Sequence, residues 1–109
     1  MVFLKRAEIL YLVLNIISYK GGISKMPAIS YFYGIVIKMY FMQNEHNPPH
    51  IHAIYGEYMS AIDIVTGKVL EGDLPNKALN LVTEWIKLYK EELLQIWKTQ
   101  NFQKLPPLL

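Results

Sequence analysis

The chain has 109 residues, of which 52% are hydrophobic, 13% aromatic and 18% charged, and it contains no cysteine. This length corresponds to one small domain, and few charges with many aromatic residues argue against intrinsic disorder. The lack of cysteine excludes disulfides, a thiolate zinc site and a cysteine nucleophile. Any metal site in this chain must therefore use His, Asp or Glu side chains.

The formal net charge of +2 is unevenly distributed along the chain. Residues 1–25 carry four basic side chains and one acidic side chain, whereas residues 26–109 carry seven lysines, eight acidic residues and no arginine. A nucleic-acid-binding module normally presents a basic stripe in which arginine contacts phosphates and bases. Nucleic acid is therefore a partner that the sequence permits but that its charge does not support.

Residues 1–25 allow two main interpretations. Their apolar stretch, residues 7–18, is shorter than the about 20 residues that cross a bilayer, and no convincing signal-peptide cleavage site follows it. The segment is either a helix docked on the domain or a leader read from a misplaced start, because Lys20-Gly21-Gly22 can be encoded by a ribosome-binding sequence before Met26. We expect a single domain over residues 26–109, no membrane association and a cytoplasmic location.

β-Branched and aromatic residues after position 25 gather in short runs that are typical of strands. Pro48-Pro49 separates the first run from the second, because proline donates no ladder hydrogen bond. Glycine-containing dipeptides at 56–57 and 66–67 indicate turns, and Gly34 inside the first run is interpreted as a bulge. The pattern predicts four strands, over residues 31–42, 50–55, 58–65 and 68–71.

A long amphipathic helix is predicted after the fourth strand. Pro75 suits the first turn, and apolar residues recur every three or four positions up to about Gln100, followed by an extended tail. The predicted apolar stripe comprises Leu79, Leu81, Val82, Trp85, Ile86, Leu88, Tyr89, Leu93, Ile96 and Trp97. The element order predicts an α+β fold: a small antiparallel sheet (β-β-β-β) with one long C-terminal helix packed on one face, in two layers.

All three histidines of the chain lie within seven residues, at His46, His50 and His52. On a strand, His50 and His52 point to the same face, and His46 can fold back from the preceding loop as a third ligand. A carboxylate from Glu45, Glu57 or Asp63 can complete the set, which would resemble a catalytic site for zinc or another divalent metal.

Two other interpretations of the histidine segment stay open. A neutral histidine can act as a general acid or base, which makes His50 and His52 catalytic candidates with Glu57 in support. Alternatively, the histidines are structural or bind a partner, and are hydrogen-bonded to neighbours such as Tyr40 or Tyr55.

Several segments resemble a family of short bacterial proteins, the domain-of-unknown-function family 4160. The resemblance covers nearly all of residues 26–109, and the unusual His-Asn-Pro-Pro-His-x-His stretch carries most of its weight. It implies a native start at Met26 and functional positions at His46, Pro48, Pro49, His50 and His52, with Tyr55 and Glu57 following. The matching segments are Met26–Ile35, Glu45–His52, Ala61–Gly67, Leu70–Pro75, Ala78-Leu79 and Val82–Trp85.

Members of this family are often encoded beside a second small protein, and such pairs look like toxin–antitoxin modules. The resemblance therefore implies a component of a two-gene module, with a small partner protein encoded nearby. If the chain is the toxin, His50 and His52 are the expected active residues, supported by His46 and Glu57. The alternatives are a metal-dependent phosphodiester hydrolase and a non-enzymatic regulatory binding module, and an uncovered sheet face favours a homo-oligomer.

Overall fold

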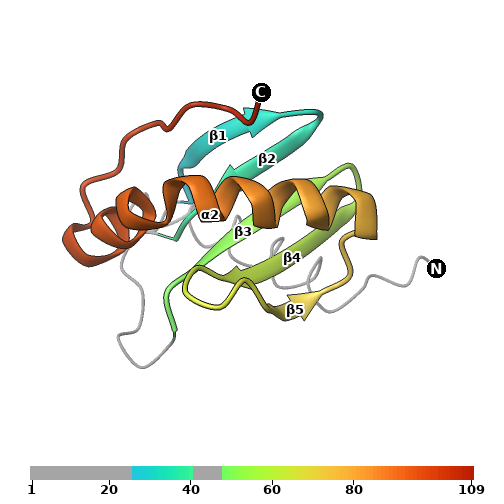
Figure 1. Ribbon diagram of the computed structural model, residues 1–109, viewed down its shortest axis with the longest axis horizontal. Helices are drawn as coiled ribbons and strands as arrows, with labels where there is room; N and C mark the ends of the chain where they lie inside the picture. Colours follow the sequence, from blue (N-terminus) through green and yellow to red (C-terminus); the bar gives the residue numbers. More distant parts are fainter. Residues whose placement is uncertain (1–25, 41–47) are drawn as a thin grey trace, which may run out of the picture.

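A computed structural model describes residues 26–40 and 48–109, so the expectations for the first 25 residues lie outside the described part of the chain. Five strands precede one helix in the sequence (Figure 1). The strands are β1 (Ala28–Phe32), β2 (Ile35–Lys38), β3 (His50–Tyr55), β4 (Tyr58–Asp63) and β5 (Val69–Gly72), and the helix is α2 (Asn76–Thr99).

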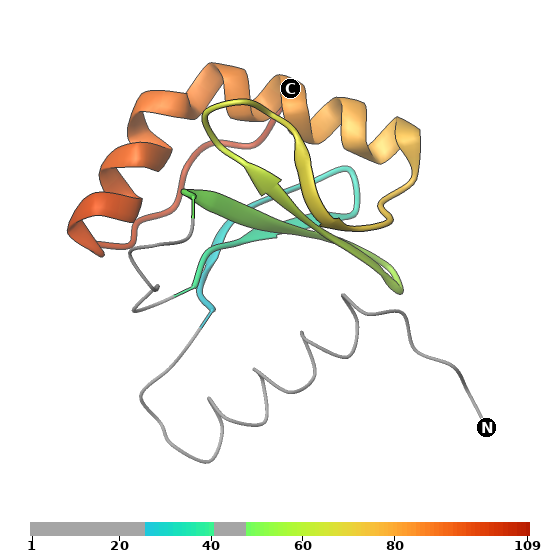
Figure 2. The same ribbon diagram turned by 90° about the horizontal axis from the view of Figure 1, so that it is seen from below.

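The strands form one antiparallel sheet in the order β1-β2-β3-β4-β5, so each strand pairs with its neighbour in the sequence. Helix α2 lies across one face of this sheet, which gives two layers (Figures 1 and 2). The predicted α+β class is confirmed. Among the described residues, no helix combines the length and the apolar character that a membrane crossing needs.

The first predicted strand is wrong in extent, because the run over residues 31–42 folds into a hairpin. Strands β1 and β2 are joined by Tyr33 and Gly34, whose φ angles are +50° and +79°. Two consecutive positive φ angles are typical of a type I′ turn, whose twist matches that of antiparallel strands. The sequence did not indicate this hairpin, because the first turn position holds a tyrosine and not one of the usual turn residues. The hairpin divides the predicted first strand, so the sheet has five strands where four were predicted.

The hydrophobic core lies between the sheet and α2. Alternate residues of the central strands, including Ile35, Ile37, Ile51 and Ile62, are fully buried in it. From the helix, the core receives Ala78, Val82, Trp85, Ile86, Leu93 and Ile96. Leu88 was predicted in the apolar stripe but is 61% exposed, so the buried face of the helix is narrower than the sequence indicated.

The end of β5 and the link that follows it to α2 pass very close to the backbone of β4. Gly72, at the end of β5, has a φ angle of +98°, and a Cβ atom there would lie 2.1 Å from the carbonyl oxygen of Met59. Two residues on, the Leu74 N–H donates to the buried Ser60 Oγ at 2.8 Å. These contacts fix the direction in which the chain leaves the sheet for the helix.

Helix α2 ends at Gln100, which takes a left-handed conformation with φ of +59°. The chain then reverses, and the extended tail runs back beside β1 (Figure 1). Its direction is fixed by a hydrogen bond from the Leu105 N–H to the Ile29 carbonyl oxygen, 2.8 Å long. The tail was predicted as extended, but nothing in its sequence indicated this attachment.

Candidate functional site

The histidine pair lies where β3 begins. The two preceding prolines bring the chain into the sheet, and the Pro49 carbonyl oxygen accepts a hydrogen bond from the Ile64 N–H at 2.9 Å. In the register of β3 and β4, His50 pairs with Asp63 and His52 with Ala61. Because β3 is a regular strand over His50–Tyr55, the two histidine side chains point to the same face of it, as predicted.

Both histidine side chains are buried in a cluster of rings. The ring centroids of His50 and His52 are 5.1 Å apart, and the Tyr40 ring lies 4.2 Å from His52 and 6.2 Å from His50. His50 also contacts Trp97, with ring centroids 5.2 Å apart. We call His50, His52, Tyr40 and Trp97 the histidine cluster.

A break in α2 accompanies the contact between the helix and the histidine cluster. Tyr89 has non-helical backbone angles (φ −115°, ψ 22°), which divide the helix near its middle. Figure 2 shows the C-terminal part of α2 turned toward the end of the sheet where β3 starts. Trp97 belongs to this part and reaches His50, so a residue predicted for the core also forms a wall of the site.

A hydrogen bond fixes which ring nitrogen of His50 carries its proton. Its Nδ1 atom lies 2.8 Å from the Pro48 carbonyl oxygen. Because a carbonyl oxygen can only accept, Nδ1 must be the protonated donor. In the neutral form of His50, the lone pair is therefore on Nε2. Orientation of one imidazole nitrogen by a backbone carbonyl is also how metal-binding and catalytic histidines are commonly held.

His52 is the more unusual member of the cluster. It is 2% exposed, and neither of its ring nitrogens has a hydrogen-bond partner within the described residues. The pKa of His52 is lowered to about 3, mainly by burial, which removes water from the charged form, and to a smaller extent by the charge of nearby His50. His52 is therefore a neutral imidazole at physiological pH.

The candidate carboxylates do not join the histidine cluster in the described structure. Asp63 pairs with His50 in register, but its Oδ1 accepts hydrogen bonds from the Val65 and Thr66 N–H groups at 2.7 and 3.0 Å. This pattern stabilises the turn after β4. Glu57 is exposed in the turn between β3 and β4, at the end of β3 opposite to His50.

Two further expectations have different outcomes. His46 and Glu45 lie outside the described residues, and among residues 26–40 and 48–109 no group of three His, Asp or Glu side chains is placed to hold a metal. The Tyr40 ring contacts both histidines, but His52 makes no hydrogen bond to it, and Tyr55 lies at the far end of β3 and is 40% exposed. The contact with Trp97 was missed, because it joins positions 47 residues apart and leaves no local signal in the sequence.

The fold and the site together define a small two-layer α+β domain with a buried histidine pair at the start of its central strand. The chain belongs to the family described as Domain of unknown function (DUF4160), whose profile matches residues 34–98. This match includes His50, His52 and Trp97. No curated protein and no solved structure matches the chain.

Proposed function

We propose that this protein is one component of a bacterial two-gene module of toxin–antitoxin type, and that it acts through partner binding and the histidine cluster. The resemblance to a family whose members are often encoded in pairs supports the module. The observation that carries the role of the cluster is the buried, neutral His52, whose ring nitrogens have no hydrogen-bond partner among the described residues, beside an oriented His50.

The chemistry of this pair favours function over structure. Burying a polar nitrogen without a hydrogen bond costs about 1–3 kcal/mol, whereas an aromatic hydrocarbon ring at position 52 would fill the same space without that cost. His50 is held so that Nε2 of its neutral form can accept a proton or bind a ligand. Such an arrangement is useful when a substrate or partner group supplies the missing hydrogen bonds.

A growth test of the full chain in a bacterial host addresses this proposal. We expect induction of the wild-type chain to arrest growth, and the double variant His50→Phe/His52→Phe to abolish the arrest, because phenylalanine keeps the rings but removes the nitrogens. The measured quantity is the growth rate after induction, compared between the wild type and each variant. Lys77→Ala changes an exposed residue at the start of α2 and is the matched control that should arrest growth like the wild type.

Two outcomes of the growth test would contradict a toxin role that depends on the histidine cluster. Arrest by both the wild type and the folded double variant would remove the histidine cluster from the activity. Growth without arrest for every variant would show that the chain is not the toxin, and an antitoxin or a regulatory binding module would then be the better explanation. Circular dichroism of each purified variant shows whether it is folded.

Divalent metal binding is a second candidate, favoured by the proximity of the two rings. Two imidazoles with centroids 5.1 Å apart can ligate one metal ion such as zinc, and Nε2 is the ring nitrogen of His50 that the hydrogen bond to Pro48 leaves for this role. His46 is the third ligand that the sequence suggests. These three side chains would leave a fourth position for water or a phosphodiester substrate.

The metal candidate is tested by calorimetric titration of the untagged, metal-free full chain with zinc. We expect one zinc ion per chain with a dissociation constant of roughly micromolar or lower, and no binding by His50→Phe/His52→Phe. His46→Ala separates the contribution of the third ligand, and Lys77→Ala is again the control. Failure of the wild-type chain to bind zinc, cobalt or nickel at micromolar concentrations would exclude this candidate.

A further inference from the structure

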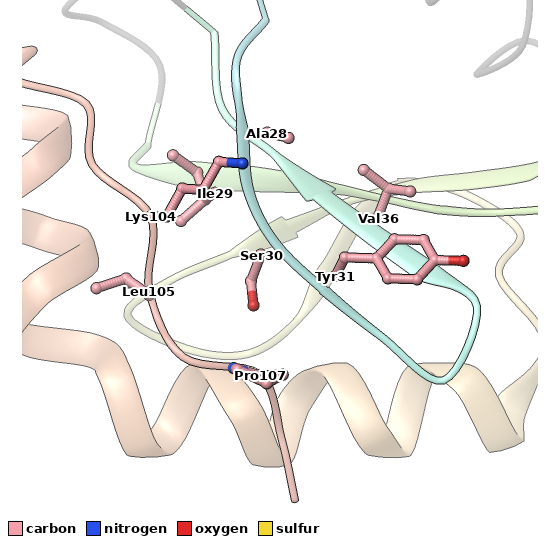
Figure 3. A pocket seen from close by; sticks show the side chains of 8 residues that line it. All are labelled: Ala28, Ile29, Ser30, Tyr31, Val36, Lys104, Leu105 and Pro107. Carbon is pink, nitrogen blue, oxygen red and sulfur yellow. The ribbon is translucent and has the colours of Figure 1, made fainter.

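The C-terminal tail, residues 101–109, is docked in a groove between β1 and α2, which we call the tail groove. Leu105 and Leu108 are each 8% exposed and join the hydrophobic core, while Pro106 and Pro107 between them face outward. Figure 3 shows the tail passing beside Ile29 and Ser30 of β1. Two buried leucines on either side of a proline pair thus form the contact.

Polar contacts hold the tail at its backbone. The Leu105 N–H donates to the Ile29 carbonyl oxygen at 2.8 Å, as an added strand would. The Pro106 carbonyl oxygen accepts from Trp85 Nε1 at 2.8 Å and from Ser30 Oγ at 3.3 Å. An indole N–H that binds a carbonyl in an extended proline segment is the chemistry by which peptide-binding domains recognise proline-rich ligands. The groove therefore has the contacts of a peptide-binding site.

The tail leaves part of the groove unfilled. A pocket of about 200 Å³ remains between the tail and β1 (Figure 3), and its wall includes Tyr31, which is 65% exposed. The segment that joins the tail to α2 begins at Gln100 in a left-handed conformation and continues through exposed residues 101, 103 and 104. Detachment of the tail would expose Leu105 and Leu108 and would remove the acceptor of the buried Trp85 Nε1, so the emptied groove would favour binding a tail again.

We propose that the tail groove is a docking site for the C-terminal tail of a second copy of the chain. The chain's own tail shows which segment fits the groove. A second copy carries the same Leu-Pro-Pro-Leu segment with the same hydrogen-bonding groups. Reciprocal exchange of tails keeps every contact of the tail groove and gives a twofold symmetric dimer. The tail lies outside residues 34–98, and the proposal does not depend on the proposed function.

The monomer and the exchanged dimer differ mainly in how the tail is delivered to the groove. In the monomer the short connection holds the tail at an effective concentration of about millimolar or higher. Exchange therefore requires high protein concentration, or folding of two chains side by side. Local accumulation of the protein would switch it from a closed monomer to a dimer.

Paramagnetic labelling of the full chain tests this exchange. The chain has no native cysteine, so Leu109→Cys, at a fully exposed last residue, accepts a single nitroxide label. An unenriched labelled chain is refolded at about 1 mM with an equal amount of nitrogen-15 wild-type chain, a concentration comparable with that of the tethered tail. In a fully exchanged mixture, roughly half of the signal intensity of the Ala28–Phe32 amides should be lost, because half of the grooves then hold a labelled tail.

Two controls make the result decisive. The labelled chain with Leu105→Asp/Leu108→Asp should leave the β1 signals unchanged, because its tail can no longer bury two apolar side chains. Excess synthetic peptide of residues 101–109 should restore the signals, and this control does not require the variant to fold. Unchanged β1 signals in the mixture, together with strong broadening when label and nitrogen-15 are in one chain, would show that the tail binds its own groove alone and would overturn the proposal.

Discussion

The variant Gly72→Ala is expected to destabilise the domain by roughly 3–5 kcal/mol, which approaches the whole stability of a domain this small. The added Cβ would lie 2.1 Å from the Met59 carbonyl oxygen and 2.7 Å from the Ser60 Cα, both of them backbone atoms that cannot move without shifting β4. The φ angle of +98° adds a conformational cost for any residue with a side chain. Urea denaturation of the purified chain measures the change.

Gly67→Ala is the matched control for this prediction. Gly67 also has a positive φ angle, of +76°, but a Cβ atom there would meet nothing within 4 Å. We expect a loss of about 1 kcal/mol, which reflects the backbone conformation alone. Equal losses for the two variants would show that the close approach to Met59 does not determine the stability.

Acid is expected to destabilise the metal-free protein through His52. The pKa of this group is lowered from 6.5 to about 3 in the folded chain, mainly by burial and further by the charge of His50. Between these two pH values the unfolded chain binds a proton that the folded chain does not, so stability falls as the pH falls. Above pH 6.5 this effect is absent. Relative to that range, the free energy of unfolding is expected to fall by roughly 2 kcal/mol at pH 5 and by 4–5 kcal/mol near pH 3.

The variant His52→Phe isolates this contribution from that of the acidic residues. It removes the titrating group and the two ring nitrogens that lack a hydrogen bond in the described part of the chain, but it keeps a ring against Tyr40. We expect higher stability than the wild type at neutral pH, by about 1–2 kcal/mol, and a weaker pH dependence between pH 6.5 and 3. Parallel pH profiles for the two proteins, from urea denaturation with a chelator present, would place the acid sensitivity elsewhere.

A more stable His52→Phe variant would also bear on the proposed function. Functional sites commonly retain groups that reduce stability, because the residues that binding or catalysis needs are often not those that would stabilise the fold most. Gain of stability with loss of growth arrest would assign His52 to function. Loss of both would indicate that the histidine is needed for the fold.

The sequence by itself determined most of the local structure, because local structure depends on local patterns. Alternating apolar residues predicted β3 over His50–Tyr55, and the three-and-four repeat predicted α2 to within about a residue at each end. The unusual spacing of histidines and prolines identified the family and placed His50 and His52 on one face of a strand. Each of these features needs only neighbours within a few positions.

The tertiary structure alone decided which distant groups meet. Glu57 is separated from the histidines by the length of β3, while Trp97 is brought to His50 by a helix broken at Tyr89. The burial that makes His52 neutral, and the hydrogen bond from Trp85 that anchors the tail at Pro106, arise from packing between elements. Such contacts depend on how the sheet and helix are placed in space, and no periodicity within either segment encodes them.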